Sequence, residues 1–187
     1  MNKCLFLDRD GTINTYLDGG ACKIEQVTLI KGVQKLIAKF IDAGWKIIVI
    51  TNQGEAVATG RCTEEEVVAI HEYMRSLLLA HGADLHALYS CPHMQNAPIK
   101  KYAIACNCRK PAPGLLLNAI KDFDADLKYS LFIGDNYTDM LCAQNAGVRF
   151  YPIDFKHVIC TRHGFRTLIE EYDDKLIEDI FAYANNP

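Results

Sequence analysis

Short apolar runs alternate with longer segments of helical periodicity along most of the chain. The apolar runs are typical of strands buried on both faces and predict β-strands at 3–8, 45–51, 85–91, 129–135 and 148–153. Apolar residues at helical spacing, bounded by capping residues and glycines, predict helices at 32–44, 63–82, 113–123 and 138–147. This alternation predicts an α/β fold: a Rossmann-like parallel sheet with helices on both faces.

The pattern weakens after residue 154, although 168–184 still predicts a terminal helix. No internal repeat, low-complexity linker or change in composition marks a boundary, so we expect a single domain over residues 1–187. The weakly patterned tail, 154–187, is expected either to pack on the sheet edge or to meet a partner.

Composition and charge are those of an ordinary globular protein. Half of the 187 residues are hydrophobic, and the net charge of −3 gives no reason to expect nucleic acid or a membrane as partner. The segment before Asp8 is too short for a signal peptide. Eight cysteines without an export signal indicate a reducing, cytoplasmic setting, in which clustered thiols more often bind metal than form disulfides. We expect a monomer.

Polar residues follow the predicted strands: Asp8 and Asp10 the first, Thr51 the second, and Asp135 a later one. Ligand sites of parallel sheets lie beyond the carboxyl ends of the strands, so we expect these residues to converge. Grouped carboxylates repel one another unless a cation lies among them, and oxygen ligands suit Mg²⁺. A carboxylate can also attack phosphorus and a second can transfer a proton, while Thr51 and Lys110 can bind phosphoryl oxygens.

Residues 91–108 carry two tight pairs of metal-binding side chains, in the stretches CPH and CNC. Together they supply three thiolates and an imidazole, a closed tetrahedral set for Zn²⁺: Cys91, His93, Cys106 and Cys108. Because four protein ligands leave no place for water, we expect a structural zinc that fixes this inserted loop and directs Arg109 and Lys110 at a phosphate. The alternative is a set of unrelated buried cysteines.

Four motifs resemble those of the haloacid-dehalogenase-like phosphatases: DRDGT at 8–12, VITNQ at 49–53, CRKP at 108–111 and IGDNYTD at 133–139. They occur in the family's order, each at the end of the expected element. The complete set favours this interpretation over the alternative that two aspartates merely cap a turn.

The resemblance implies a role for each matching residue. Asp8 would be the nucleophile and Asp10 the general acid, then base, while Thr51 and Lys110 would hold the phosphoryl group. It also implies Mg²⁺ ligands, with the last in a supporting place: Asp8, Asp10 through its main-chain oxygen, Asp135 and Asp139.

The zinc loop is similar to that of a group of small phosphatases acting on heptose 1,7-bisphosphates and on histidinol phosphate. The length between His93 and Cys106 matches the heptose group. The resemblance implies a small phosphorylated metabolite as substrate, the 7-phosphate of D-glycero-D-manno-heptose 1,7-bisphosphate first and histidinol phosphate or another phosphomonoester second, with no large cap domain. It assigns substrate binding to four residues: Asn52, Gln53, Arg109 and Asp18.

Substrate-facing stretches depart from the heptose pattern. They are TNQGEAVATGR at 51–61, YLDGGAC at 16–22, and Asn136 where the heptose enzymes often have lysine. The alternative from another class is a non-catalytic module that holds a phosphorylated ligand in the same pocket. The intact set of catalytic positions favours an enzyme.

Overall fold

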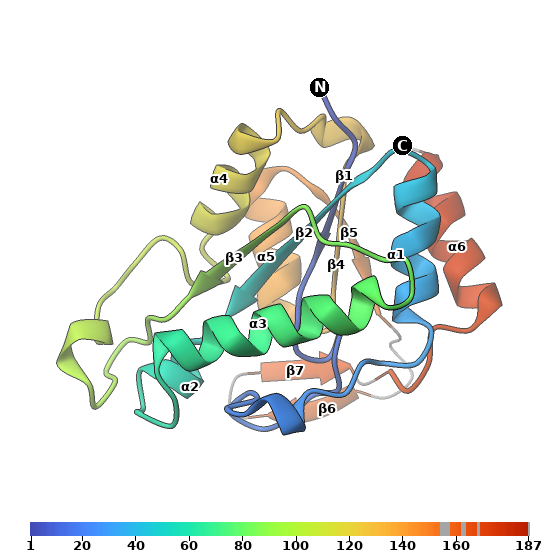
Figure 1. Cartoon of the computed structure of the whole chain (residues 1–187). Coiled ribbons are helices and arrows are strands. Elements are labelled where there is room, and N and C mark those ends of the chain that lie inside the picture. The colour runs from blue at the N-terminus through green and yellow to red at the C-terminus, as the bar shows by residue number, and fades with distance from the viewer. Residues whose placement is uncertain (154–157, 162–163, 168, 187) are drawn as a thin grey trace.

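Five parallel strands form the centre of the protein, in the order β3-β2-β1-β4-β5 (Figure 1). The computed structural model describes residues 1–153, 158–161, 164–167 and 169–186. The strands are β1 (Cys4–Leu7), β2 (Lys46–Asn52), β3 (Ala87–Cys91), β4 (Leu131–Gly134) and β5 (Arg149–Pro152). All neighbouring pairs are parallel, because a helix lies in each connection and carries the chain back. The predicted α/β sheet is confirmed.

Six α-helices occur in the described residues: α1 (Val33–Asp42), α2 (Gly54–Val57), α3 (Glu64–Leu79), α4 (Gly114–Asp122), α5 (Tyr137–Ala146) and α6 (Asp174–Asn185). The four helices predicted between the strands are confirmed as α1, α3, α4 and α5. The sequence pattern does not predict α2, which is a single turn after β2. None of the helices described is long and apolar enough to cross a bilayer.

Alternate side chains along each inner strand point to opposite faces of the sheet. On β1, Leu5 and Leu7 pack with α1, α3 and α6, whereas Cys4 and Phe6 pack with α4 and α5. All four side chains are fully buried. Because helices cover both faces, the strands are continuous apolar runs rather than alternating ones.

The described part of the C-terminal tail packs back onto the protein. Its helix begins at Asp174 rather than at 168, because the Asp173 side chain accepts a hydrogen bond from the Leu176 amide (2.7 Å) and caps the helix there. In α6, Phe181 lies edge-on to Phe40 of α1, with ring centroids 5.2 Å apart. The described part of the tail therefore packs against α1.

A hairpin occupies part of the weakly patterned stretch, where the sequence predicts no strand. Its antiparallel strands are β6 (Val158–Thr161) and β7 (Gly164–Thr167). Beyond the hairpin, Tyr172 is buried and makes two hydrogen bonds to the segment after β1. Its hydroxyl donates to the Thr12 carbonyl (2.9 Å), and its backbone amide donates to the Lys31 carbonyl (2.8 Å). The tail therefore braces the loop that follows β1.

Candidate active site

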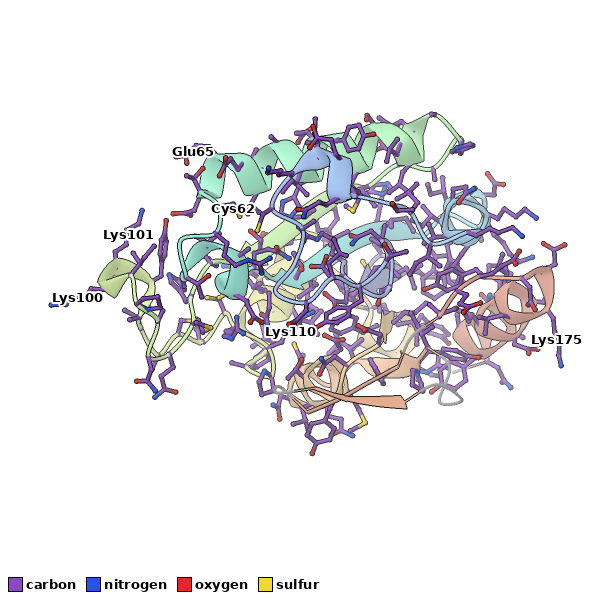
Figure 2. All side chains as sticks on the ribbon, turned by 90° about the horizontal axis from the view of Figure 1, so that it is seen from below. Cys62, Glu65, Lys100, Lys101, Lys110 and Lys175 are labelled. Carbon is purple, nitrogen blue, oxygen red and sulfur yellow. The ribbon has the colours of Figure 1, made fainter. Side chains whose placement is uncertain are left out.

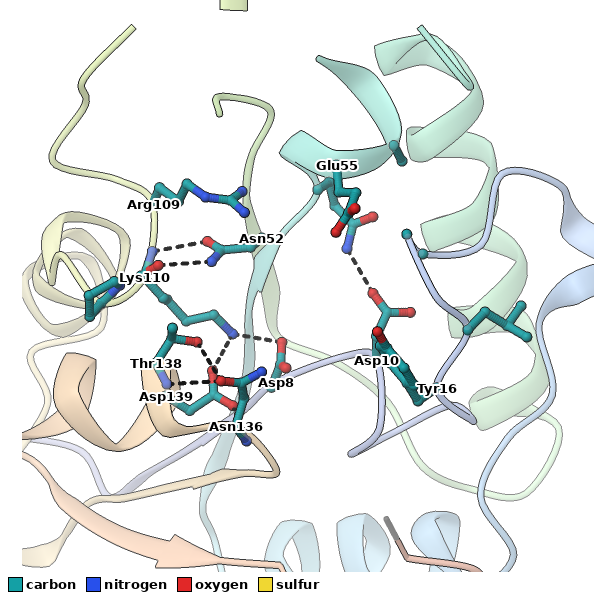
Figure 3. Close-up of a pocket in the computed structure, with 16 residues that line it drawn as sticks. Asp8, Asp10, Tyr16, Asn52, Glu55, Arg109, Lys110, Asn136, Thr138 and Asp139 are labelled. Atoms are coloured by element: carbon teal, nitrogen blue, oxygen red, sulfur yellow. Dashed lines mark hydrogen bonds and ion pairs between the residues drawn. The ribbon is translucent and has the colours of Figure 1, made fainter. Parts of the chain in front are cut away.

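The segments that follow β1, β2 and β4 meet beyond the carboxyl ends of these strands and enclose a cavity of about 270 Å³ (Figure 3). The cavity is lined by most of the predicted site residues: Asp8, Asp10, Asn52, Gln53, Arg109, Lys110 and Asp139. Thr51 and Asp135 are buried next to them. The convergence predicted from the strand ends is therefore present.

The start of α5 presents Asp139 to this cavity through a reciprocal cap. The Asn136 side chain accepts from the Thr138 amide (3.0 Å), and the Asp139 carboxylate accepts from the Asn136 amide (3.0 Å). A Cβ on Gly134 would lie 2.6 Å from the Asp139 side chain, so a glycine is needed where β4 ends.

Lys110 lies between two carboxylates on one side of the cavity. Its Nζ is 2.7 Å from Asp8 Oδ1 and 2.7 Å from Asp139 Oδ1 (Figure 3). It also donates to the Ile50 carbonyl (2.8 Å). Burial by itself would lower the pKa of Lys110, but the charges of Asp139 and Asp8 raise it. The side chain is therefore a fixed cation that faces the cavity.

Three buried carboxylates meet on the same side. Asp8, Asp135 and Asp139 each offer an oxygen, and these ligand atoms all lie within 4.8 Å of one another. One ammonium cannot balance three carboxylates, so this cluster favours an additional cation. An all-oxygen set of this size fits a hard divalent ion such as Mg²⁺.

Asp10 lies across the cavity in different surroundings. Arg9 donates to its carboxylate from Nε (3.1 Å) and from Nη2 (2.9 and 2.7 Å), while Asn14 and Gln53 each donate one hydrogen bond of 3.0 Å. Burial would raise the pKa of Asp10, but the Arg9 charge and these hydrogen bonds lower it to about 2. The carboxylate form is strongly favoured.

Arg9 is itself fully buried and makes a further contact to α3. Its Nη1 lies 3.0 Å from Nε2 of His71, which is 7% exposed. Burial, followed by the Arg9 charge, lowers the pKa of His71 to about 3. Sequence reasoning missed both residues, although His71 shares the apolar face of α3 with Val67 and Met74.

Hydrogen bonds tie the end of β2 to both sides of the cavity. The Asn52 side chain donates to the Lys110 carbonyl and accepts from the Lys110 amide, each at 3.0 Å. The Gln53 side chain bonds both Asp10 (3.0 Å) and the Thr51 hydroxyl (2.8 Å). Asn52 and Gln53 therefore hold the Lys110 backbone and the side chains of Asp10 and Thr51 in place, and they also line the cavity.

The four predicted zinc ligands come together in the loop after β3. Cys91 Sγ lies 3.1 Å from Cys108 Sγ and 3.6 Å from Cys106 Sγ, and His93 Nδ1 lies 3.3 Å from Cys108 Sγ. Zinc–sulfur bonds of about 2.3 Å give tetrahedral edges of about 3.8 Å, so the donors are grouped closely enough for one Zn²⁺. Burial raises the pKa of Cys106, but hydrogen bonds from Cys108 and from nearby amides lower it to about 6. This donor set fits zinc.

The zinc loop reaches the cavity through Arg109, which donates to the His93 carbonyl (3.1 Å). A Cβ on Gly54 would lie 2.1 Å from that same carbonyl, so α2 and the loop are in close contact. Asp18 is exposed and accepts from the Tyr16 hydroxyl (3.2 Å), whereas its neighbours rather than Asp18 line the cavity. Tyr16 and Glu55 also line it, without having been predicted.

Comparisons with known proteins agree with this geometry. A family model described as HAD-hydrolase-like matches residues 107–153. The D-glycero-beta-D-manno-heptose-1,7-bisphosphate 7-phosphatase of Yersinia pestis is 35% identical over 144 residues, which cover 77% of this chain and 76% of that protein.

Two solved structures share the fold over almost the whole chain. A HAD-like phosphatase from Mesorhizobium loti is 28% identical and superposes with a TM-score of 0.81, covering 98% of this chain and 86% of that one. The D,D-heptose 1.7-bisphosphate phosphatase from B. bronchiseptica, complexed with magnesium and phosphate, is 24% identical with a TM-score of 0.76, covering 97% and 99%.

Proposed function

The chain belongs to the haloacid-dehalogenase-like phosphatases, and we propose that it removes the 7-phosphate of D-glycero-D-manno-heptose 1,7-bisphosphate through a phospho-aspartate. The observation that carries this proposal is the placement of Asp8 and Asp10 on two sides of one cavity. The buried Lys110 ammonium contacts Asp8, whereas Asp10 is paired with the guanidinium of Arg9. The relative in Yersinia pestis, named for this activity, supports the choice of substrate.

In the first step, an oxygen of Asp8 forms a bond to phosphorus while the bond between phosphorus and the sugar oxygen breaks. The Lys110 ammonium and the Thr51 hydroxyl bind the transferring phosphoryl oxygens, whose charge they stabilise. Mg²⁺ is assigned to Asp8, Asp135 and the main-chain oxygen of Asp10, with support from Asp139. When bound, it neutralises phosphate charge that would repel the nucleophile.

Asp10 serves the leaving group and then the water. It gives a proton to the departing sugar oxygen, and in the second step it takes a proton from the water that hydrolyses the phospho-aspartate. Its pairing with Arg9 suits the second role, which needs a carboxylate. The first role needs a protonated group, and the negative charge of an arriving phosphate favours proton uptake.

The zinc assigned to Cys91, His93, Cys106 and Cys108 is structural in this proposal. It holds the loop that carries Arg109 to the cavity, where this cation can bind the part of the substrate beyond the reacting phosphate. Asn52 and Gln53, which line the cavity, complete the proposed substrate contacts, whereas Asp18 lies outside the lining. This sparse enclosure suits a small sugar bisphosphate.

We further propose a cytoplasmic, single-domain monomer over residues 1–187 that needs neither nucleic acid nor membrane. A zinc site with three thiolates is best kept in a reducing compartment. The net charge of −3 gives no reason to expect a polyanion as partner.

The test is phosphate release with Mg²⁺ across a panel: both anomers of the heptose bisphosphate, histidinol phosphate and several common sugar phosphates. A clear preference for one heptose anomer in kcat/KM supports the proposal. Preference for histidinol phosphate or another monoester would replace the substrate and keep the chemistry. Binding of these compounds without turnover by the wild-type protein would indicate the non-catalytic module instead.

A further inference from the structure

Arg9 links the active site to α3 without lining the substrate cavity. Its guanidinium holds the Asp10 carboxylate on one side (Nη2 to Oδ2, 2.7 Å) and contacts His71 Nε2 on the other (3.0 Å from Nη1). We propose that His71, acting through Arg9, is a positioning residue that holds Asp10 toward the leaving oxygen of the substrate. This inference rests on the acid–base role proposed above for Asp10.

Chemistry fixes the direction of the His71 contact. A guanidinium carries only N–H donors, so Nε2 of His71 must accept, and the ring is the neutral tautomer with its proton on Nδ1. Both side chains are buried, so water does not reach this N–H while a side chain fills the His71 position. Without this acceptor, a buried N–H of Arg9 would lose its partner, and the guanidinium would turn to find another.

A turn of the guanidinium would move Asp10. Arg9 makes three hydrogen bonds to this carboxylate, whereas the side-chain amides of Asn14 and Gln53 make one each. The plane of the guanidinium therefore sets the plane of the carboxylate. Proton transfer requires the two oxygen atoms to be about 2.6–3.2 Å apart. A small rotation of the Asp10 carboxylate would therefore slow the reaction of any substrate whose leaving oxygen needs a proton.

On its other side, His71 lines a second cavity of about 280 Å³ together with Arg75, His86 and Ser90. The His71–Arg9–Asp10 chain thus runs from this second cavity to the substrate cavity, because its first and last members line one each. The second cavity offers a small molecule a path to the His71 position when the ring is absent.

The test compares His71→Leu, which removes the acceptor at similar volume, with His71→Gln, whose side-chain oxygen can replace Nε2. The kcat/KM is measured with the best sugar phosphate and with p-nitrophenyl phosphate, whose leaving group departs without a proton. General acid–base catalysis contributes about 10²–10⁴-fold, so His71→Leu is expected to lower the sugar phosphate value at least about tenfold. The aryl phosphate value should fall less than about threefold, and His71→Gln should stay within about threefold on both.

Met74→Ala is the control, because it removes packing from the same buried face of α3. It is expected to change kcat/KM for the two substrates by the same factor. Equal losses on both substrates in His71→Leu, or no loss, would overturn the positioning role. If that variant does not fold, His71→Ala is assayed with and without imidazole. Selective recovery on the sugar phosphate supports the role, and folded protein without recovery overturns it. A wild-type protein that hydrolyses neither substrate would refute the proposed function itself.

Discussion

Asp8 and Asp10 are two residues apart, yet their side chains lie on two sides of the cavity in contrasting surroundings (Figure 3). Asp8 lies among carboxylates and shares Lys110 with Asp139. Asp10 is held by Arg9 and by the side-chain amides of Asn14 and Gln53. The comparison teaches that neighbours, rather than residue type, divide the labour between two aspartates.

The two cations differ in the same way. Lys110 lines the cavity and is buried, and Figure 2 shows it near the middle of the view, away from the exposed Lys100 and Lys101 at one end. Arg9 does not line the cavity. The cation beside Asp8 can therefore bind the substrate directly, whereas the cation beside Asp10 can only organise the protein.

Replacing each aspartate should break the comparison most strongly. Asp8→Asn removes the nucleophile and is expected to lower turnover by at least about 10⁴-fold on every substrate. Asp10→Asn should lower kcat/KM for sugar phosphates by about 10²–10⁴-fold. It should spare the kcat/KM of p-nitrophenyl phosphate, which reports only the steps up to the phospho-aspartate, and lower its kcat, which includes the hydrolysis step that needs the base. Steady-state kinetics on both substrates measures the difference, with the exposed Asp42→Asn as control. Indistinguishable profiles for the two variants would contradict the division of roles.

Removing the zinc should act most directly on the Asp8 side, because Lys110 lies two residues beyond Cys108. Cys108→Ser is expected to lose metal and to lower the free energy of unfolding by at least about 3 kcal/mol, since structural zinc contributes directly to folding. Metal analysis and denaturant unfolding check this, with Cys22→Ser as a matched control outside the zinc set. Full zinc content in the Cys108 variant would show that the ligand set is wrong.

On the Asp10 side, His71 should make the free energy of unfolding depend on pH. The pKa of His71 is about 3 in the folded protein against 6.5 ordinarily. Between about pH 6.5 and pH 3, therefore, the unfolded chain takes up this proton and the folded protein does not. Stability should therefore fall as the pH falls, by about 2 kcal/mol from pH 7 to pH 5.

His71→Gln removes this titration and should flatten that part of the profile, as measured by urea unfolding at each pH. The exposed His81→Gln should leave the slope unchanged. A smaller residual slope is expected from His86, whose pKa burial and then Lys46 also lower. An unchanged slope in His71→Gln would mean that this imidazole is not held neutral in the folded protein.

The smallest effect is expected at Tyr172, which braces the loop shared by both aspartates. Tyr172→Phe removes one buried hydrogen bond to Thr12 and should cost about 1–2 kcal/mol of unfolding free energy. Activity on the two substrates should change by the same factor, because the brace serves both sides. Thermal unfolding and kinetics test this, with the exposed Tyr183→Phe for comparison.

Much of this site could be predicted because its chemistry is written in local motifs. Asp8, Thr51 and Asp135 follow recognisable strands, and parallel strands bring their carboxyl ends together. The zinc ligands likewise come in tight pairs. Arg9 and His71 could not be paired from sequence, because 62 positions separate them and a histidine on an apolar helix face gives no spacing signal.

The fold follows the same division. The strands between 3 and 153 are apolar enough to be identified, and the capping box at Thr63 and Glu66 marks the start of α3. The hairpin of β6 and β7 lacks such a pattern, and α2 is too short to show periodicity. The predicted terminal helix, 168–184, begins too early because apolar residues continue before the N-cap at Asp173.

The bond from Tyr172 to Thr12 joins positions 160 apart in the chain. Proteins are made from the N-terminus, so the loop with both aspartates leaves the ribosome well before Tyr172 does. Every catalytic motif has been synthesised by Asp139, yet the brace arrives only with the tail. A nascent chain stalled between these points would hold the full set of motifs on an unbraced loop. The braced site can therefore form only after Tyr172 has been synthesised.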